Sequence, residues 1–273
     1  MSRLVASTLL FSLVACGGLA DIRPEALQTD IPRSVQDDGA QRFSQMVEAH
    51  GGMEAWSQFE TVDTTFRDEW TNWLFFQITP YAQNNQLAAL HARLQEFPHG
   101  RIEFLEGKGE GEVWTAKGNR ITRDKRGKHK VSLAWEDSFF AVFVLNPEFM
   151  VGTPFRLASA DHFAHVGTRT WKDKEYDVVL LSWGDFAPQE RLDQWLLYID
   201  PDTGLLAATE FTIRMSGQSQ TGFYHYRDYQ ETEGLMLAHA MDAYLNKNDK
   251  KPVHRYAFDA FELSTSAVSD AVQ

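Results

Sequence analysis

The sequence predicts a mainly β protein: a strongly curved antiparallel sheet, or an unclosed β-barrel, with helices that lid its concave side. Runs with a polar–apolar period of two recur along the 273-residue chain, as in strands that bury one face. Turn-forming residues separate them, most clearly from Asp200 to Gly204, where proline presets the turn and glycine supplies a positive φ. Since roughly ten strands with few helices leave edges exposed, the sheet has to curl.

The first expected helix spans Ala40–His50. Apolar residues recur there at helical spacing, and Gly51-Gly52 is a typical stop. His50 is expected as a helix-end residue whose partly charged imidazole complements the helix dipole. A short turn follows over residues 53–59.

Two later segments are also expected to be helical. Leucines recur at helical spacing over Gln86–Phe97, and an apolar helix is expected from Ser138 to about Leu145, followed by an irregular apolar stretch that ends at Phe155. The remaining elements are expected to be strands, at residues 62–69, 101–105, 111–116, 119–123, 131–135, 162–170, 176–183, 195–199, 205–215, 222–229, 235–246 and 254–263.

The beginning of the chain has the pattern of an export signal. Arg3 precedes an apolar run from Leu4 to Leu13, which is too short for a spanning helix of about 20 residues. The sequence Leu-Val-Ala-Cys at residues 13–16 resembles the lipobox of bacterial lipoproteins, which implies that Cys16 becomes the lipid-bearing first residue. By the same analogy, Gly17 favours the outer membrane of a Gram-negative bacterium, facing the periplasm. An ordinary signal peptide with a chance cysteine is the alternative.

Composition limits the function classes. The formal net charge of −12 argues against a nucleic-acid partner, which requires a broad basic face, and the single cysteine excludes an internal disulfide. Hydrophobic residues make up 43% of the chain, enough for a substantial core. The expected organisation is a signal peptide (1–15), a lipidated tether (16–38), one β domain (39–263) and a disordered tail (264–273).

Aromatic residues gather in two segments that would meet inside a curved sheet. A large apolar cavity between sheet and lid is what an acyl chain requires. The alternative is a plain core, because a concave face needs large side chains to fill it. The predicted apolar-ligand residues are Trp70, Trp73, Phe75, Phe76, Phe139, Phe140, Phe143, Phe149, Met150 and Phe155.

Two of the expected hairpins have distinctive sequences. The first is Trp-Leu-Leu-Tyr-Ile-Asp-Pro-Asp-Thr-Gly at residues 195–204, and the second is Tyr-Gln-Glu-Thr-Glu-Gly-Leu-Met-Leu at residues 229–237. Both resemble hairpins of the LolA/LolB-like superfamily. The resemblance extends over about residues 40–263. It implies an unclosed antiparallel β-barrel lidded by helices that binds lipoprotein acyl chains or other lipids. The chain departs from the pattern in its length and in the segment from Trp70 to Phe97.

A basic run interrupts the acidic chain between Arg120 and Lys130. It is either a solvated hairpin tip or a contact with lipid headgroups, since each basic residue near an anionic surface adds about 1 kcal/mol. The residues predicted for headgroup contact are Arg123, Lys125, Arg126 and Lys128.

Catalytic signals are weak. The sequence lacks a nucleophile elbow, a zinc-protease motif and a phosphate loop. His162 and His165 are three apart on an expected strand and would point to opposite faces, so a metal site with His225 is not favoured. We expect a non-enzymatic protein without cofactors. Its partners would be an acyl chain or lipidated protein and, through Cys16, the membrane. A periplasmic hydrolase using His and Asp in the concavity and an interaction module of the envelope remain alternatives.

Overall fold

The computed structural model describes residues 18–28, 30–77, 79–127, 130–134, 140–214 and 219–265. Its strands form a single antiparallel sheet in the order β6-β5-β4-β3-β2-β1-β13-β12-β11-β10-β9-β8-β7, with β14 paired to β1. The sheet order ends at β6 and β7, which do not pair with each other, so the sheet is not closed. The strands are β1 (Thr61–Trp70), β2 (Gln86–Arg93), β3 (His99–Phe104), β4 (Glu112–Lys117), β5 (Arg120–Lys125), β6 (Lys130–Ala134), β7 (His162–Trp171), β8 (Lys174–Ser182), β9 (Gln194–Ile199), β10 (Leu206–Thr212), β11 (Thr221–Thr232), β12 (Leu235–Tyr244), β13 (His254–Phe258) and β14 (Glu262–Ser264).

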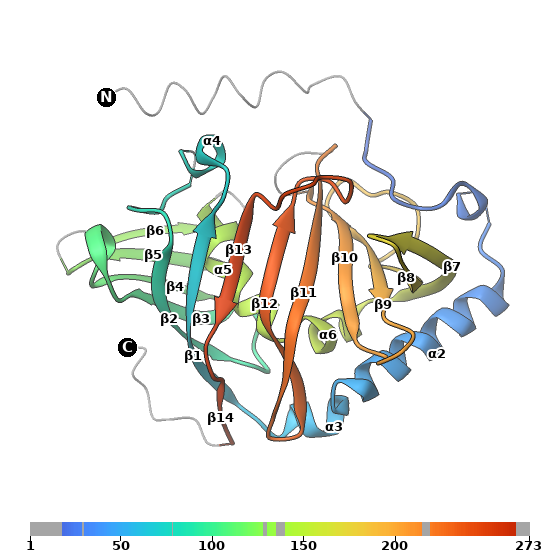
Figure 1. Ribbon diagram of the computed structural model, residues 1–273, viewed down its shortest axis with the longest axis horizontal. Helices are drawn as coiled ribbons and strands as arrows, with labels where there is room; N and C mark the ends of the chain where they lie inside the picture. The colour runs from blue at the N-terminus through green and yellow to red at the C-terminus, as the bar shows by residue number, and fades with distance from the viewer. Residues whose placement is uncertain are drawn as a thin grey trace.

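Short helices accompany this sheet. In Figure 1, α2 runs along the side of the molecule that holds β7 to β9, and α5 and α6 lie behind the central strands. The helices are η1 (Glu25–Leu27), α2 (Arg33–Ala49), α3 (Gly52–Ser57), α4 (Trp73–Phe76), η2 (Gly107–Gly109), α5 (Phe140–Val151), α6 (Thr153–Arg156) and η4 (Leu157–Ser159). Among the described residues, none of these helices has the length and apolar character to cross a membrane. The predicted fold class is confirmed.

The main core lies between the helices and one face of the sheet. Buried side chains of α2, α3, α5 and α6 share a single cluster with residues of β1 and β8, as shown by Phe43, Trp56, Phe155, Phe66 and Leu181. The helices therefore cover the inner face of the open sheet, and the apolar side chains of alternate strand residues point toward them.

A smaller core lies on the outer face of β8 and β9. Leu27 and Ile31 pack there with Val178, Leu196 and Tyr198. Since the segment before α2 covers this face, β9 is buried at every position. The described residues between 18 and 32 are therefore docked on the sheet, and we call this segment the strap. Residues 33–38 are the first part of α2, which begins at Arg33 and not at Ala40. The predicted tether is wrong for this described part, because its few apolar residues have a surface to cover.

Three further expectations differ from the structure. Gln86–Phe97 is not a helix, because Gln86, Ala88, Leu90 and Ala92 alternate into the core as β2, paired with β1 and β3. The helix expected to end near Leu145 continues through Pro147 to Val151. The strand expected over 254–263 divides into β13 and β14, both paired with β1.

The two hairpins that carry the family resemblance form as predicted. In the β9–β10 turn, the N–H of Gly204 donates to the carbonyl of Asp200 at 2.8 Å, and Gly204 has a φ of +74°. Glu233 and Gly234 both have positive φ between β11 and β12, as a two-residue hairpin turn requires.

His50 closes α2 in a different way from the prediction. Its Nε2 accepts the N–H of Leu206 at 3.0 Å, and its Nδ1 lies 2.9 Å from the carbonyl oxygen of Met236. An accepting Nε2 requires a protonated Nδ1, so the neutral ring bridges the β9–β10 and β11–β12 hairpins. Burial lowers the pKa of His50 to about 4. The predicted partial charge is wrong because the ring is buried.

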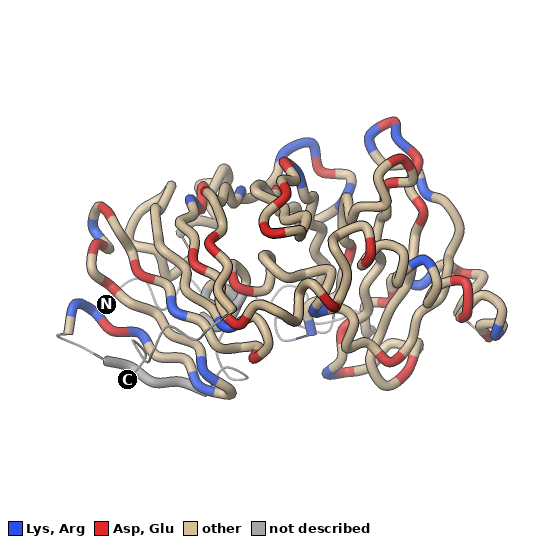
Figure 2. Tube along the Cα trace, turned by 90° about the horizontal axis from the view of Figure 1, so that it is seen from below, with Lys and Arg blue, Asp and Glu red and all other residues tan. Residues whose placement is uncertain are grey.

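Charge is dispersed over the surface. In Figure 2, acidic and basic positions are interspersed along much of the trace, and no broad basic face is seen from this side.

Candidate ligand-binding site

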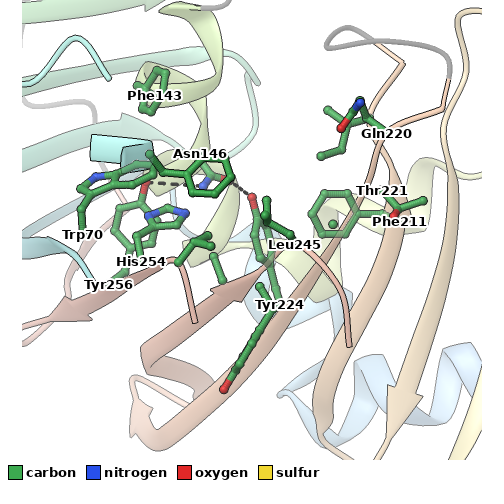
Figure 3. Close-up of a pocket in the computed structure, with 16 residues that line it drawn as sticks. Trp70, Phe143, Asn146, Phe211, Gln220, Thr221, Tyr224, Leu245, His254 and Tyr256 are labelled. Carbon is green, nitrogen blue, oxygen red and sulfur yellow. Dashed lines mark hydrogen bonds between the residues drawn. The ribbon is translucent and has the colours of Figure 1, made fainter. Parts of the chain in front are cut away.

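An apolar cavity of about 180 Å³ lies at one end of the inner face of the sheet. It opens where β1, β10 and β12 end and where β11 and β13 begin, with α4 and α5 on its other sides (Figure 3). A closed apolar cavity of about 150 Å³ stays dry and accepts benzene, so this space accommodates a short hydrocarbon segment. Its lining residues are Trp70, Phe75, Phe143, Asn146, Phe211, Ile213, Gln220, Thr221, Gly222, Tyr224, Ala243, Tyr244, Leu245, Val253, His254 and Tyr256.

Trp70 is held at the cavity by the end of β1. Its backbone N–H donates to Asn84 Oδ1 at 2.7 Å, and Asn84 Nδ2 donates back to its carbonyl at 2.8 Å. The indole stacks on His254 with ring centroids 4.3 Å apart and 12° between the ring planes. These contacts fix a flat aromatic wall on this side of the cavity.

The predicted aromatic residues divide into cavity wall, core and surface. Trp70, Phe75 and Phe143 line the cavity. Trp73 is 72% exposed on α4, and Phe76 packs partly buried against the core.

The α5–α6 aromatics fill the inner face away from the cavity. Phe149 contacts Phe97 and Trp195, while Phe155 stacks on Trp56 at 4.5 Å. Met150 is buried in the same core. Four of the ten predicted apolar residues, Phe76, Phe149, Met150 and Phe155, are therefore core. Phe139 and the side chain of Phe140 lie outside what the structure describes.

Asn146 forms a polar bridge across one side of the cavity (Figure 3). It accepts a hydrogen bond from the hydroxyl of Tyr224 at 3.1 Å and donates through Nδ2 to the hydroxyl of Tyr256 at 3.4 Å. Burial raises the pKa of both phenols, so they stay protonated at neutral pH. The bridge provides fixed dipoles without a formal charge.

Asp68 and His254 form a buried pair behind this wall. His254 Nδ1 lies 3.2 Å from Asp68 Oδ1, and Asp68 is 1% exposed. Asp68 Oδ2 and the hydroxyl of Tyr81 are buried and, among the described residues, lack a hydrogen-bond partner in the structure. The sequence analysis missed this pair, although the alternation of Thr64, Phe66 and Asp68 already placed a carboxylate on the buried face of β1.

The other histidines are dispersed. His162 contacts the carbonyl of Gly184 at 3.0 Å, and His165 lies 2.7 Å from Asp38. His225 is on β11, which β8, β9 and β10 separate from β7. The described part of the chain contains no group of three His, Cys, Asp or Glu side chains placed to hold a metal ion.

The basic run lies in the β5–β6 hairpin. Arg123 pairs with Glu112, and its Nη2 donates to the carbonyl of Pro80 at 3.2 Å. Arg126 donates to the carbonyls of Glu110 and Lys108. Both guanidinium groups therefore have partners within the protein, whereas Lys125 is exposed. Lys128 and Cys16 lie outside the described residues.

Comparison with solved structures identifies the architecture. The chain is similar to a LolA superfamily protein from Nitrosomonas europaea, with a TM-score of 0.51 and 13% identity over 82% of this chain and 93% of that one. A domain named for outer membrane lipoprotein sorting, from Vibrio parahaemolyticus, matches with a TM-score of 0.52 and 10% identity over 83% and 92% of the two chains. A DUF1329 family protein from Desulfovibrio piger matches with a TM-score of 0.53 and 7% identity over 85% and 95%.

The chain has the LolA-like fold. The resemblance stated from the two hairpins is thereby confirmed at the level of fold. No family model matches the sequence. None of the curated proteins matches it either.

Proposed function

We propose that this protein is a lipoprotein of the bacterial envelope that holds an acyl chain, or a similar apolar ligand, in its LolA-like half-barrel for transfer or sensing. The observation that carries the proposal is the apolar cavity of about 180 Å³ at the open end of the inner face. The names of the structural relatives, which include LolA and lipoprotein sorting, support it. Cys16 would carry the lipid that anchors the protein in the outer membrane.

The size of the cavity sets the expected affinity. A space of this volume takes roughly six carbons, and each buried methylene contributes about 0.8 kcal/mol. The sum of about 5 kcal/mol corresponds to a dissociation constant somewhat below about 1 mM. A tighter complex requires that the ligand also make contacts outside the cavity or displace the side chain of Phe75, which lines the cavity from α4.

Binding is favoured over hydrolysis by the chemistry of the wall. A hydrolase in this cavity would use Asp68 and His254 as its basic pair. Among the described residues that line the cavity there is no serine or cysteine, and Thr221, which carries a hydroxyl, lies on β11 and not on β1 or β13 with that pair. The polar bridge of Asn146 with Tyr224 and Tyr256 is better suited to orient a bound ligand than to catalyse its hydrolysis.

Filling the cavity tests the proposal. Ala243→Trp places an indole in the cavity from the inner face of β12, so we expect the dissociation constant for a fluorescent long-chain fatty acid to rise by at least about tenfold. Thr232→Trp, at the far end of the neighbouring strand β11, is the matched control and should bind like the unmodified protein. Equal binding by all three proteins would place the ligand elsewhere, and no binding by any of them would favour the interaction module.

A further inference from the structure

An exposed apolar pair lies beside the mouth of the cavity. Trp73 is 72% exposed and Leu74 is 51% exposed, both on α4. Phe75, the next residue of the helix, turns inward and lines the cavity. A single exposed apolar side chain needs no explanation, but adjacent large ones at the entrance of an apolar space indicate a contact surface.

The structure holds α4 in this position. The side chain of Asn72 caps the helix by accepting the N–H groups of Leu74 at 3.0 Å and Phe75 at 3.3 Å. The N–H groups of Thr71 and Asn72 lie 3.0 and 3.3 Å from the carbonyl oxygen of Val253. The exposed pair is therefore presented by an anchored turn, which is fixed to the loop between β12 and β13.

That loop adds a third apolar residue and positive charge. Leu245, which is 45% exposed, follows β12 and also lines the cavity. Lys250 and Lys251 are exposed a few residues later. Within the described part of the chain, neither lysine forms an ion pair, whereas Lys247 is paired with Glu210 at 3.0 Å. Asp249 is the acid in this loop.

The start of the described chain lies at the same edge of the sheet. The carbonyl of Ala20 accepts from Arg214 Nη2 at 2.5 Å, and the N–H of Ile22 donates to Gln194 Oε1 at 3.2 Å. Gln194 begins β9 and Arg214 follows β10, at the end of the sheet where the cavity opens. Figure 1 shows α4 and the beginning of the strap (blue) both at the upper edge of the molecule.

We propose that this edge docks on the surface of a bilayer that contains anionic phospholipid. We define the docking rim as Trp73, Leu74, Leu245, Lys250 and Lys251. Tryptophan is enriched at membrane interfaces, and lysine near such a surface pairs with anionic headgroups. Docking in this orientation places the cavity mouth against the lipids. The docking is independent of the ligand-binding proposal, because the rim can bind a bilayer even if the cavity holds nothing.

Vesicle sedimentation tests the docking. The contacts of the strap with the sheet begin at Ala20, so the chain from Gly17 onward keeps the fold and lacks the predicted lipid attachment site. We expect it to sediment with vesicles of phosphatidylethanolamine and phosphatidylglycerol and less with phosphatidylcholine alone. Trp73→Ala with Leu74→Ala should lower the partition coefficient at least about tenfold on both vesicles. Lys250→Glu with Lys251→Glu should lower it by a similar factor on the anionic vesicles only.

Matched controls lie at the opposite edge. Met53, 40% exposed on α3, and Lys117, exposed at the end of β4, have the same chemistry away from the rim. Met53→Ala and Lys117→Glu should sediment like the parent chain. Failure of the parent chain to sediment with either vesicle, or an equal loss in the controls, would overturn the proposal. Rim variants that sediment like the parent chain would also overturn it. Fatty-acid binding by the rim variants should persist, which separates this test from that of the cavity.

Discussion

Replacing His50 with leucine is expected to lower the free energy of unfolding by about 2–5 kcal/mol. The imidazole is the partner of the Leu206 N–H and the Met236 carbonyl, and each buried group left without a partner costs about 1–3 kcal/mol. His50→Gln retains a donor and an acceptor and should recover part of the loss. Urea denaturation with an unchanged slope measures the effect. His91→Leu, which removes a half-buried pairing with Asp63, is the control, and an equal loss there would contradict the bridging role.

The same variant isolates a pH dependence. Because the pKa of His50 is depressed to about 4 in the folded protein, the unfolded chain binds more protons between pH 4 and about 6.5. The stabilisation by His50 is therefore complete above about pH 6.5 and is lost as the pH falls through 4. The half-buried His225, whose pKa is also lowered to about 4, acts in the same direction.

Glu148 has the opposite effect on the pH dependence of stability. Burial raises its pKa to about 7, so the folded state binds more protons than the unfolded chain from about 4.5 to 7 and loses stability as the pH rises. The contributions of His225 and Glu148 cancel when His50→Leu is compared with the parent protein. The difference in unfolding free energy between these two proteins should therefore shrink as the pH is lowered from 6.5 to 4. A constant difference would mean that the ring is not held neutral.

Removing Arg156 is expected to cost about 3–5 kcal/mol of stability, because a buried carboxylate would lose its counter-charge. Arg156 Nη2 lies 3.8 Å from Glu148 Oε1, with the side chains 7% and 1% exposed. The guanidinium also stacks over Phe97 at 4.6 Å, and the N–H of His99 donates to Glu148 at 3.0 Å. The pair thus connects α5 and α6 to the start of β3.

The double variant is the decisive control for this pair. Glu148→Gln with Arg156→Met removes both charges and keeps the acceptor for His99, so it should be more stable than Arg156→Met alone. Denaturation at pH 8, above the folded-state pKa of Glu148 of about 7, gives the largest difference. If the single and double variants unfold at the same denaturant concentration, the carboxylate does not depend on Arg156.

Local sequence patterns were sufficient for much of the fold. The β9–β10 and β11–β12 hairpins follow from Gly204 and Gly234, whose turn conformations few other residues adopt. The Gln86–Phe97 segment could not be assigned in this way, because Leu87, Leu90 and Leu94 fit a helix while Ala88, Leu90 and Ala92 fit a strand. Pairing with β1 and β3 decides between them, and both partners are distant in the sequence.

The residues of the cavity could likewise be predicted only in part from the sequence. Trp70, Phe75 and Phe143 stand out in the sequence because they lie in aromatic segments. Tyr224 and His254 do not, since β11 and β13 bring them to the cavity from the far end of the chain. Phe149 and Phe155 resemble ligand contacts in the sequence, yet α5 and α6 use them to fill the inner face.

Native mass spectrometry of the protein purified gently from a Gram-negative envelope tests the central claim most directly. The account predicts one bound molecule with the mass of an acyl-chain compound, released on collisional activation and absent from Ala243→Trp. A bare protein mass that stays unchanged after incubation with long-chain fatty acid would contradict the proposal that this half-barrel holds a lipid.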